Sequence, residues 1–377
     1  MEVFQSIYKE NNWTVPLVEN MDVQWVLLFG SHDLLGNREL IQHIKSVYPN
    51  AEITGCTTSG ALCDTSIYDD DLCLTAIRFK HASISVIADS LSNYQNSAEL
   101  GRSLAKKIPL DRLKHVFVIS DGHYVNGSDL VTGLCQELPD KVFLTGGLAG
   151  DGTRFESTHV LWNDRLEEKM VILVPIYGDD LVVARSHHSG WKPYGPDRRI
   201  TKSEKNVLFE IDDKPALEMY KTYLGKHAEE LPAAALRFPI GLKSPETDEL
   251  IVRTILSINE DDQSMVFAGN IPSGSVCQIM HANYDNLIEA SATAVEKAFE
   301  ESGELKPSLA ILVSCVGRRI VLGVRTDEEV DEVRTVVGDN CYITGFYSYG
   351  EISSADANEK RCGLLNQTMT VTLIEEN

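Results

Sequence analysis

Hydrophobic residues along the chain form short apolar runs that alternate with amphipathic segments. The first run, residues 26–29, ends at Gly30 and is followed by a segment with apolar residues at helical spacing. The next strand ends in the tripeptide Ile-Thr-Gly at 53–55 and leads into a turn rich in threonine, serine and glycine. The pattern predicts a strand, a helix and a second strand in that order.

The same order recurs twice. Apolar runs at 116–119 and 309–313 each precede a predicted helix and a strand that ends in Leu-Thr-Gly at 144–146 or Ile-Thr-Gly at 343–345. Three copies with one ending indicate related units, and generic α/β design is the alternative explanation. Two neighbouring strand-like runs, 72–79 and 82–88, predict a hairpin between the first two copies. The expected fold class is therefore α/β, with mixed sheets built from repeated β-α-β units.

The length of 377 residues exceeds one typical core, so two domains are expected. A helix predicted at 215–224 begins with proline and is followed by a segment that prolines interrupt. We place the boundary there, with an N-terminal, ligand-sensing domain over 1–220 and a C-terminal domain over 221–377. A long helix at 283–301 has an apolar stripe that faces the second core.

The formal charge of −22 carries no compensating basic block, which argues against nucleic acid as a partner. Attraction to anionic membranes is disfavoured for the same reason, and no apolar run reaches the roughly 20 residues that span a bilayer. The first residues lack the features of a signal peptide. We therefore expect a cytoplasmic protein without membrane insertion, whose eight cysteines are thiols.

Residues 185–196 contain the most unusual cluster of side chains in the sequence. The stretch includes two adjacent histidines, Trp191, two glycines and two prolines. Glycine and proline at this density predict a shaped loop between two strands. Because adjacent strand residues face opposite sides, His187 and His188 suit a single ligand bond better than a chelating pair.

Other candidate groups lie in the turns of the repeated units. His32 and His123 each follow a first strand, at the strand end where open α/β sheets bind ligands, and a polar loop histidine is the alternative. Ser59, Cys56 and Ser348 are candidate nucleophiles in turns, but no motif supplies a base. The P-loop, H-E-x-x-H, G-x-S-x-G and C-x-x-C-H signatures are absent from the sequence.

Three segments resemble those of the FIST proteins, a bacterial sensory family with an N-terminal and a C-terminal FIST domain. They are Ser-Gly-Trp-Lys-Pro-Tyr-Gly-Pro at 189–196, the segment 210–218, and Gly-Phe-Tyr-Ser-Tyr-Gly-Glu-Ile at 345–352. The resemblance implies a ligand-sensing module rather than an enzyme. Expected partners are a histidine kinase, a cyclic-di-GMP enzyme or a chemotaxis receptor, and homo-oligomers are compatible with the sequence.

The resemblance also suggests ligands. One stand-alone branch of the family binds haem and senses nitric oxide, which makes haem b a candidate cofactor with His188 or His187 on the iron. Imidazole on ferrous iron leaves a site for a diatomic gas. The alternatives are an amino acid or other metabolite bound without haem, or a hydrolase with a Ser or Cys nucleophile.

The family segments supply the candidate ligand contacts. These are Gly190, Trp191, Lys192, Pro193, Gly195, Tyr347 and Tyr349. Because the segment at 185–196 precedes the expected boundary, a ligand held there would alter the angle between the domains.

Overall fold

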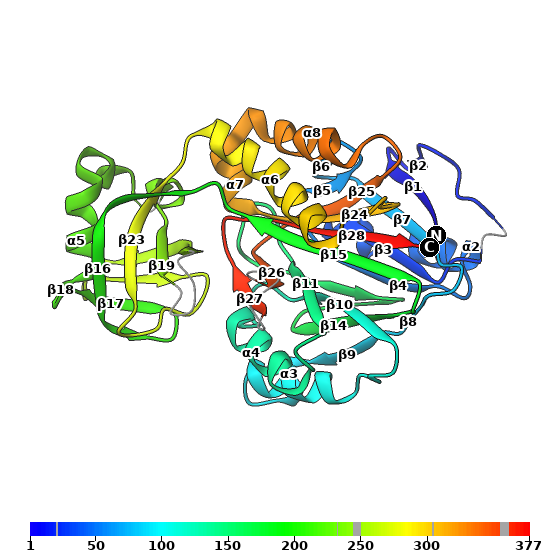
Figure 1. The fold of residues 1–377 in the computed structure, drawn as a ribbon, viewed down its shortest axis with the longest axis horizontal. Coiled ribbons are helices and arrows are strands. Elements are labelled where there is room, and N and C mark those ends of the chain that lie inside the picture. Colours follow the sequence, from blue (N-terminus) through cyan, green and yellow to red (C-terminus); the bar gives the residue numbers. More distant parts are fainter. Residues whose placement is uncertain (20–21, 232, 244–249, 304, 355–361) are drawn as a thin grey trace.

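The structure is a computed structural model that describes residues 1–19, 22–231, 233–243, 250–303, 305–354 and 362–377. It has two lobes, a large α/β body and a smaller β lobe (Figure 1). The chain leaves the body through β15 (Leu181–His188) and enters the lobe at β16 (Lys192–Glu204). It returns from β23 (Val276–His281) to α6 (Tyr284–Ser302). The two termini lie side by side, and the Met1 amino group is 3.1 Å from a Glu376 carboxylate oxygen.

The body consists of three units with the same order of elements. Unit 1 contains β3 (Trp25–Gly30), α1 (His32–Leu35), α2 (Arg38–Val47), β4 (Glu52–Thr57) and β7 (Leu72–Arg78). Unit 2 contains β10 (Leu113–Ser120), α4 (Gly127–Glu137), β11 (Phe143–Leu148) and β14 (Met170–Tyr177). Unit 3 contains β24 (Leu309–Cys315), α7 (Val316–Leu322), α8 (Thr326–Val337), β25 (Tyr342–Ser348) and β28 (Met369–Glu376). In each unit the first two strands are parallel and the last is antiparallel to the first, which confirms mixed sheets built from β-α-β units.

Each unit contributes a hairpin to the sheet of another unit. After β4, β5 (Ala61–Cys63) pairs with β25 and carries β6 (Ser66–Tyr68). After β11, β12 (Val160–Trp162) pairs with β4 and carries β13 (Arg165–Glu167). After β25, β26 (Gly350–Ser354) pairs with β11 and carries β27 (Cys362–Leu365). This cyclic exchange ties the three sheets into one body.

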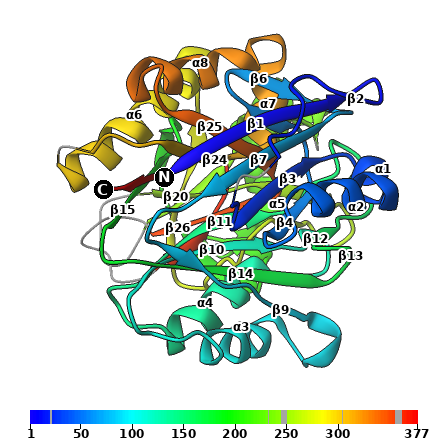
Figure 2. The same ribbon diagram turned by 90° about the vertical axis from the view of Figure 1, so that its right-hand side faces the viewer.

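Further strands and one further α-helix of the body lie outside the three units. The remaining elements of the body are β1 (Glu2–Lys9), β2 (Asn12–Trp13), β8 (Ser83–Ile84), β9 (Ile87–Ser90) and α3 (Ser97–Lys106). Figure 2 shows α3 and α4 on one side of the sheets and α6 and α8 on the opposite side. The predicted hairpin of 72–79 and 82–88 is wrong, because β7 pairs with β1 and β3 whereas β8 and β9 pair with β14. An apolar run predicts a strand, but it does not specify the partner of that strand.

The Thr-Gly ending has a steric cause in all three units. A Cβ atom at the glycine would lie within 2.0 Å of a carbonyl oxygen of the neighbouring parallel strand, so only glycine fits. The glycines and the residues that bear these oxygens are Gly55 with Leu28, Gly146 with Val118, and Gly345 with Leu312. The repeated motif therefore shapes the sheets.

The β lobe is a separate sheet with its own apolar core. Besides β16 and β23 it contains β17 (Val207–Ile211), β18 (Lys214–Pro215), β19 (Ile240–Lys243), β20 (Leu250–Arg253), β21 (Ile255–Asn259) and β22 (Ser264–Phe267). The helix α5 (Ala216–Leu224) and the 3₁₀ helices η2 (Gly225–Glu230) and η3 (Ala233–Arg237) cover it. The expected domain boundary at 220/221 lies inside α5. Strands on either side of that boundary share sheets, β15 with β28 and β11 with β26.

The segment 185–196 is less irregular than its composition predicts. Strand β15 continues through His188 and β16 begins at Lys192, so the structure contradicts the predicted loop. Pro193 and Gly195 are tolerated because β16 pairs with β23 only as far as Tyr194 before the register shifts. Residues 189–191 are the crossing between the lobes. The segment 185–196, where a bound ligand is expected to alter the angle between the domains, therefore contains this crossing.

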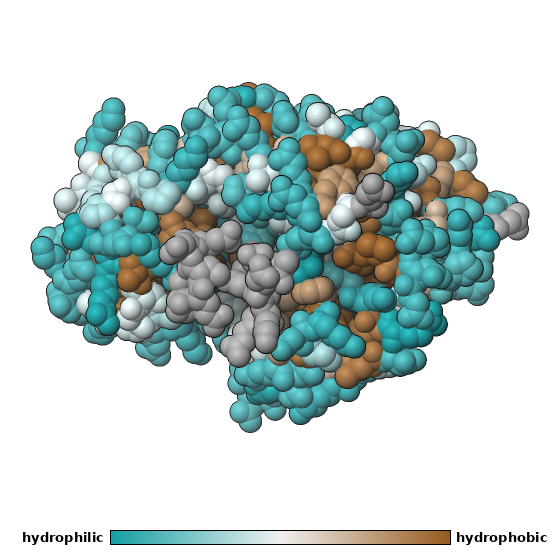
Figure 3. Space-filling view, viewed as in Figure 1, coloured by the Kyte–Doolittle hydropathy of each residue, from teal (hydrophilic) through white to brown (hydrophobic). Residues whose placement is uncertain are grey.

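Three further features concern the surface, the cysteines and the hydropathy of the helices. The surface in Figure 3 is mainly hydrophilic, with hydrophobic side chains exposed in separate patches. None of the eight cysteines, all of which lie within the described residues, forms a disulfide. Within the described ranges, no helix has the length and apolar character needed to cross a membrane.

Candidate functional site

The strands β3, β10 and β24 end on one face of the body, where the chain turns toward the helices. Two cavities open on this face, of about 750 and about 770 Å³, and Val316 lines both. The first, the polar cavity, lies within the body beside Ser31, Ser59 and Arg319. The second, the interlobe cleft, lies between the body and the β lobe. Strand ends of this kind are the usual ligand sites of α/β sheets.

Two carboxylates of the polar cavity, Asp69 and Asp151, have polar partners. Arg319 Nη1 lies 2.6 Å from an Asp69 carboxylate oxygen. Asp151 accepts hydrogen bonds from the backbone N–H groups of residues 155–157 and from the Tyr349 hydroxyl. Burial alone would raise the pKa of Asp151, but these hydrogen bonds lower it below its ordinary value. The lining of the polar cavity is therefore acidic, and two of its carboxylates, Asp69 and Asp151, already have partners.

The interlobe cleft has walls from both lobes. The body side comes from the loop after β10, the end of β11, the start of α7 and the end of β25. Its residues are Gly122, His123, Tyr124, Val125, Asn126, Gly127, Leu148, Phe155, Cys315, Val316, Gly317 and Tyr349. The lobe side consists of Asn206, Glu230, Leu231, Leu236, Thr254, Ile255, Leu256, Phe267 and Ala268. A volume of this size suits a drug-sized organic molecule.

Three large hydrophobic side chains in this cleft are exposed to solvent. Tyr124 is 44%, Phe155 43% and Leu256 50% exposed. Phe155 adopts φ +56°, a left-handed conformation that bulky residues rarely hold, and its ring stacks on Tyr349 at 4.6 Å between centroids. Exposed apolar groups gathered in one concavity are typical of a binding site.

A buried carboxylate shapes the loop that carries Tyr124. Asp121 accepts hydrogen bonds from the backbone N–H groups of His123 at 2.9 Å and Tyr124 at 2.6 Å. Its other oxygen accepts from the Thr158 hydroxyl at 3.1 Å and the Lys169 backbone N–H at 3.1 Å. The prediction that His123 stands at a strand end beside a ligand site agrees with this geometry, and His32 has the corresponding place in the polar cavity.

A polar group without a partner lies in the wall of the cleft. Thr254 is 5% exposed, and its hydroxyl has no hydrogen-bond partner among the described residues. Glu230 is the only carboxylate in the described lining, and its oxygens contact His227 and Arg237. No lysine or arginine belongs to the described lining.

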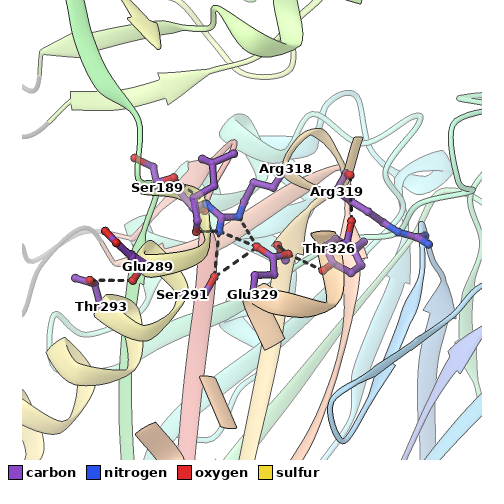
Figure 4. Close-up of polar contacts among 12 residues, drawn as sticks. Ser189, Glu289, Ser291, Thr293, Arg318, Arg319, Thr326 and Glu329 are labelled. Carbon is purple, nitrogen blue, oxygen red and sulfur yellow. Dashed lines mark hydrogen bonds and ion pairs between the residues drawn. The ribbon is translucent and has the colours of Figure 1, made fainter. Parts of the chain in front are cut away.

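A buried ion pair anchors the crossing between the lobes. Arg318 and Glu329 are fully buried with 2.7 Å between Nη2 and a carboxylate oxygen. Arg318 also donates to the Ser189 carbonyl at 2.8 Å and the Leu287 carbonyl at 2.6 Å, and Glu329 accepts from Tyr347 (Figure 4). Removal of one partner would leave a buried charge without compensation. The network therefore holds residue 189 against the body.

The residues after Ser189 pack at the junction of the two lobes. Trp191 is buried, with Val252 and Met280 of the lobe and Leu287, Ile288 and Leu322 of the body in one apolar cluster. Gly190 has φ +75°, and a Cβ there would lie 2.4 Å from the Asn286 carbonyl oxygen. Lys192, Pro193 and Gly195 are exposed on β16 and line neither cavity.

His187 and His188, which precede the crossing, do not form a haem pocket. His187 and His188 lie in β15, opposite Thr370 and Met369 of β28, and neither lines the polar cavity or the cleft. Burial, with a further effect of Lys297 and Arg318, lowers the pKa of His188 to about 4. A haem needs an open slot beside its axial ligand, and the residues around His188 do not fit one. Among the described residues no group of three or more His, Cys, Asp or Glu is arranged to hold a metal ion.

The other predicted side chains also differ in position, because some line a cavity and others are buried. Tyr349 lines the cleft, whereas Tyr347 is fully buried beneath it. Ser348 donates to Glu351 at 2.6 Å, but both are fully buried, and burial raises the pKa of Glu351 to about 8. Ser59 lines the polar cavity and donates to the Gly152 carbonyl at 2.9 Å. Burial raises the pKa of the Cys56 thiol well above its ordinary value.

The structure is a two-lobed α/β protein with a cleft between its lobes. The model of the FIST N domain matches residues 24–214 and that of the FIST C domain matches 216–354. The chain belongs to the FIST family, whose domains serve as sensors in signal transduction.

The sequence identity to individual proteins is 21% or less, and the two solved structures have TM-scores below 0.5. An uncharacterised protein of Methanocaldococcus jannaschii is 21% identical over 359 residues, which cover 85% of this chain and 67% of that protein. A cyanuric acid hydrolase from A. caulinodans has a TM-score of 0.37 at 7% identity, with 94% of this chain and 90% of that one covered. A second cyanuric acid hydrolase structure has a TM-score of 0.31 at 11% identity and covers 94% and 92%. At these scores the two structures do not bear on the function of this chain.

Proposed function

We propose that this protein is a cytoplasmic sensor whose small-molecule ligand binds in the interlobe cleft. The observation that supports this function best is a cavity of about 770 Å³ with walls from both lobes and three exposed hydrophobic side chains in it. Because the ligand would contact both lobes at once, it favours the lobe arrangement that gives the most contact. A signalling partner, such as a histidine kinase or a cyclic-di-GMP enzyme, reads that arrangement.

The contacts around the cleft suit this role. Asn270 of the β lobe donates to Asp129 of the body at 2.9 Å, and Arg253 of the lobe donates to the Leu364 carbonyl at 2.9 Å. These polar contacts flank the cleft without filling it. Movement of the lobe would occur at the two crossings, residues 189–191 and 282–283.

A thermal-shift screen of small organic molecules against the full chain tests the proposal. We expect hits whose stabilisation is lost in Leu256→Arg, which places a charge in the cleft, and retained in Ile320→Arg, the matched change in the polar cavity. Both residues are exposed hydrophobics, so neither change disturbs a core. Hits that respond to Ile320→Arg but not to Leu256→Arg would move the ligand site to the polar cavity.

Lobe movement needs a separate readout. With 5-fluorotryptophan in the four tryptophans, the ¹⁹F resonance of Trp191 at the crossing should shift on binding of a hit. Trp25, fully buried in the body, should stay unchanged. A ligand that binds without moving the Trp191 resonance would contradict the sensing step.

A haem-based nitric oxide sensor makes a different prediction. Protein purified from cells supplied with a haem precursor would then show a Soret band that His188→Ala or His187→Ala removes. The proposed cleft sensor predicts the same thermal-shift hits with and without added haemin.

A further inference from the structure

The lining of the interlobe cleft restricts the charge of its ligand. A carboxylate or phosphate transferred from water into a cavity needs a cation or several donors, because burial of an unpaired charge is costly. The described lining contains no lysine or arginine, and its carboxylate, Glu230, is already paired with His227 and Arg237. Within the described lining an anionic ligand would meet no lysine or arginine, and Lys169, whose Nζ lies 4.6 Å from the Tyr124 ring centroid, is a neighbouring cation held over that ring. A cationic ligand would compete with Arg237 for Glu230.

The Thr254 hydroxyl restricts the polar groups of the ligand. Thr254 lines the cleft, and its buried hydroxyl has no hydrogen-bond partner in the described part of the chain; a polar group in this state normally takes one from water or a ligand. A hydroxyl can donate one hydrogen bond and accept others. It therefore matches a single hydroxyl, amide or carbonyl group on a ligand.

The other walls favour a flat apolar framework. Tyr124, Phe155 and Tyr349 supply three rings on the body side, and Leu256 faces the same cavity from the β lobe. The Phe155 and Tyr349 rings are nearly parallel, with 19° between their planes. An aromatic molecule gains both area burial and ring stacking against such a surface.

We propose that the ligand is a neutral, largely aromatic molecule with one hydrogen-bonding group, which Thr254 recognises. This proposal rests on the proposed function, because it specifies the chemistry of the same cleft. It separates this chain from a sensor of free amino acids, which carry both a carboxylate and an ammonium group at neutral pH.

Isothermal titration calorimetry with four naphthalene probes tests the proposal on the full chain. The probes are 2-naphthol, naphthalene, anionic 2-naphthoate and cationic 2-naphthylmethylamine. We expect 2-naphthol to bind at least about tenfold more tightly than either charged probe, because the described lining contains no lysine or arginine and its carboxylate is already paired. Thr254→Val should weaken 2-naphthol about fivefold, the value of one neutral hydrogen bond, and leave naphthalene unchanged.

A matched variant controls for the loss of a buried hydroxyl. Thr370→Val removes another buried hydroxyl without a described partner, in β28 and outside both cavities. It should leave the affinity for 2-naphthol unchanged. Leu256→Arg should abolish binding of 2-naphthol if the probe occupies the cleft.

The outcomes separate the two proposals. Tighter binding of 2-naphthoate or of the cationic probe, equal affinities of Thr254→Val and wild type for 2-naphthol, or no binding of 2-naphthol would each overturn the inference about ligand class. The cleft sensor itself would survive any of these if other hits from the screen depend on Leu256. It falls only if no hit does.

Discussion

The polar cavity and the interlobe cleft open at corresponding strand ends of the body, yet their walls differ in chemistry. The polar cavity is formed by the body alone, and its ion pair of Asp69 with Arg319 lies within one lobe. The cleft receives about half of its wall from the β lobe, and that half supplies Leu256, Ile255 and Thr254. The comparison indicates that the β lobe completes the apolar cleft, so that a ligand there would contact both lobes.

The largest expected effect comes from the network that attaches the lobe. Arg318→Met leaves Glu329 buried without its cation, which should lower the free energy of unfolding by about 3–5 kcal/mol in urea titrations. The double variant Arg318→Met/Glu329→Leu should recover most of that loss. Arg325→Met, which breaks exposed pairs with Glu328 and Asp285, is the control and should have a far smaller effect. Equal losses for Arg318→Met and Arg325→Met would contradict the role of the buried pair.

The crossing itself should be the next most sensitive point. Gly190→Ala combines a left-handed backbone with a Cβ 2.4 Å from the Asn286 carbonyl oxygen, so we expect roughly 2–3 kcal/mol of destabilisation. Gly225→Ala has φ +56° but open space around the new methyl group, and it should cost about 1 kcal/mol. Thermal unfolding of both variants measures the difference, and equal melting temperatures would mean that the tight packing of Gly190 is unimportant.

A pair of aspartates compares the two cavities directly. Asp121→Asn replaces one acceptor oxygen of the loop beside the cleft with a donor, which should cost about 1–3 kcal/mol and weaken 2-naphthol binding. Asp69→Asn removes a half-exposed partner of Arg319 in the polar cavity and should cost at most about 1 kcal/mol, without effect on binding. Urea titration and calorimetry measure the two effects. Unchanged 2-naphthol affinity in a folded Asp121→Asn variant would separate that loop from the site.

The smallest effect concerns pH. The folded-state pKa of His188 lies at about 4, below the ordinary value near 6.5, so the unfolded chain takes up the proton more readily. Its contribution to stability is complete above pH 6.5 and is lost as the pH falls toward 4. At pH 5.5, with allowance for solvent screening of a half-buried group, His188→Gln should remove about 1 kcal/mol of the acid sensitivity. His81→Gln, at an exposed position, is the control, and coincident curves for His188→Gln and wild type would refute the assignment.

Much of the fold could be predicted from periodicity. The helix predicted at 283–301 is α6, that at 215–224 is α5, and that at about 327–337 is α8. The three Thr-Gly copies marked the three units correctly, because the steric need for glycine beside a strand carbonyl leaves a direct trace in the sequence. Strand pairing left no such trace, since the hairpins exchange between units that lie far apart in the chain.

The site was less accessible to sequence reasoning. His123 and Tyr349 both line the cleft, because each follows a strand and these strand ends share one face. The composition of the segment 185–196 predicted a loop with ligand contacts. In the structure, Gly190 and Trp191 pack at the crossing between the lobes. Phe155, Thr254 and Leu256 gave no signal, because each is unremarkable until two lobes bring them together. A left-handed φ at Phe155 is visible only in the structure.

The most direct test of the cleft is a titration of 2-naphthol followed in methyl NMR spectra of the full chain with labelled Ile, Leu and Val. The proposed site predicts that the largest shifts occur at Ile255 and Leu256 of the lobe and Leu148 of the body, while Ile320 in the polar cavity stays unchanged. Shifts that centre on Ile320, with Ile255 and Leu256 unaffected at saturation, would contradict the claim that the ligand binds between the lobes.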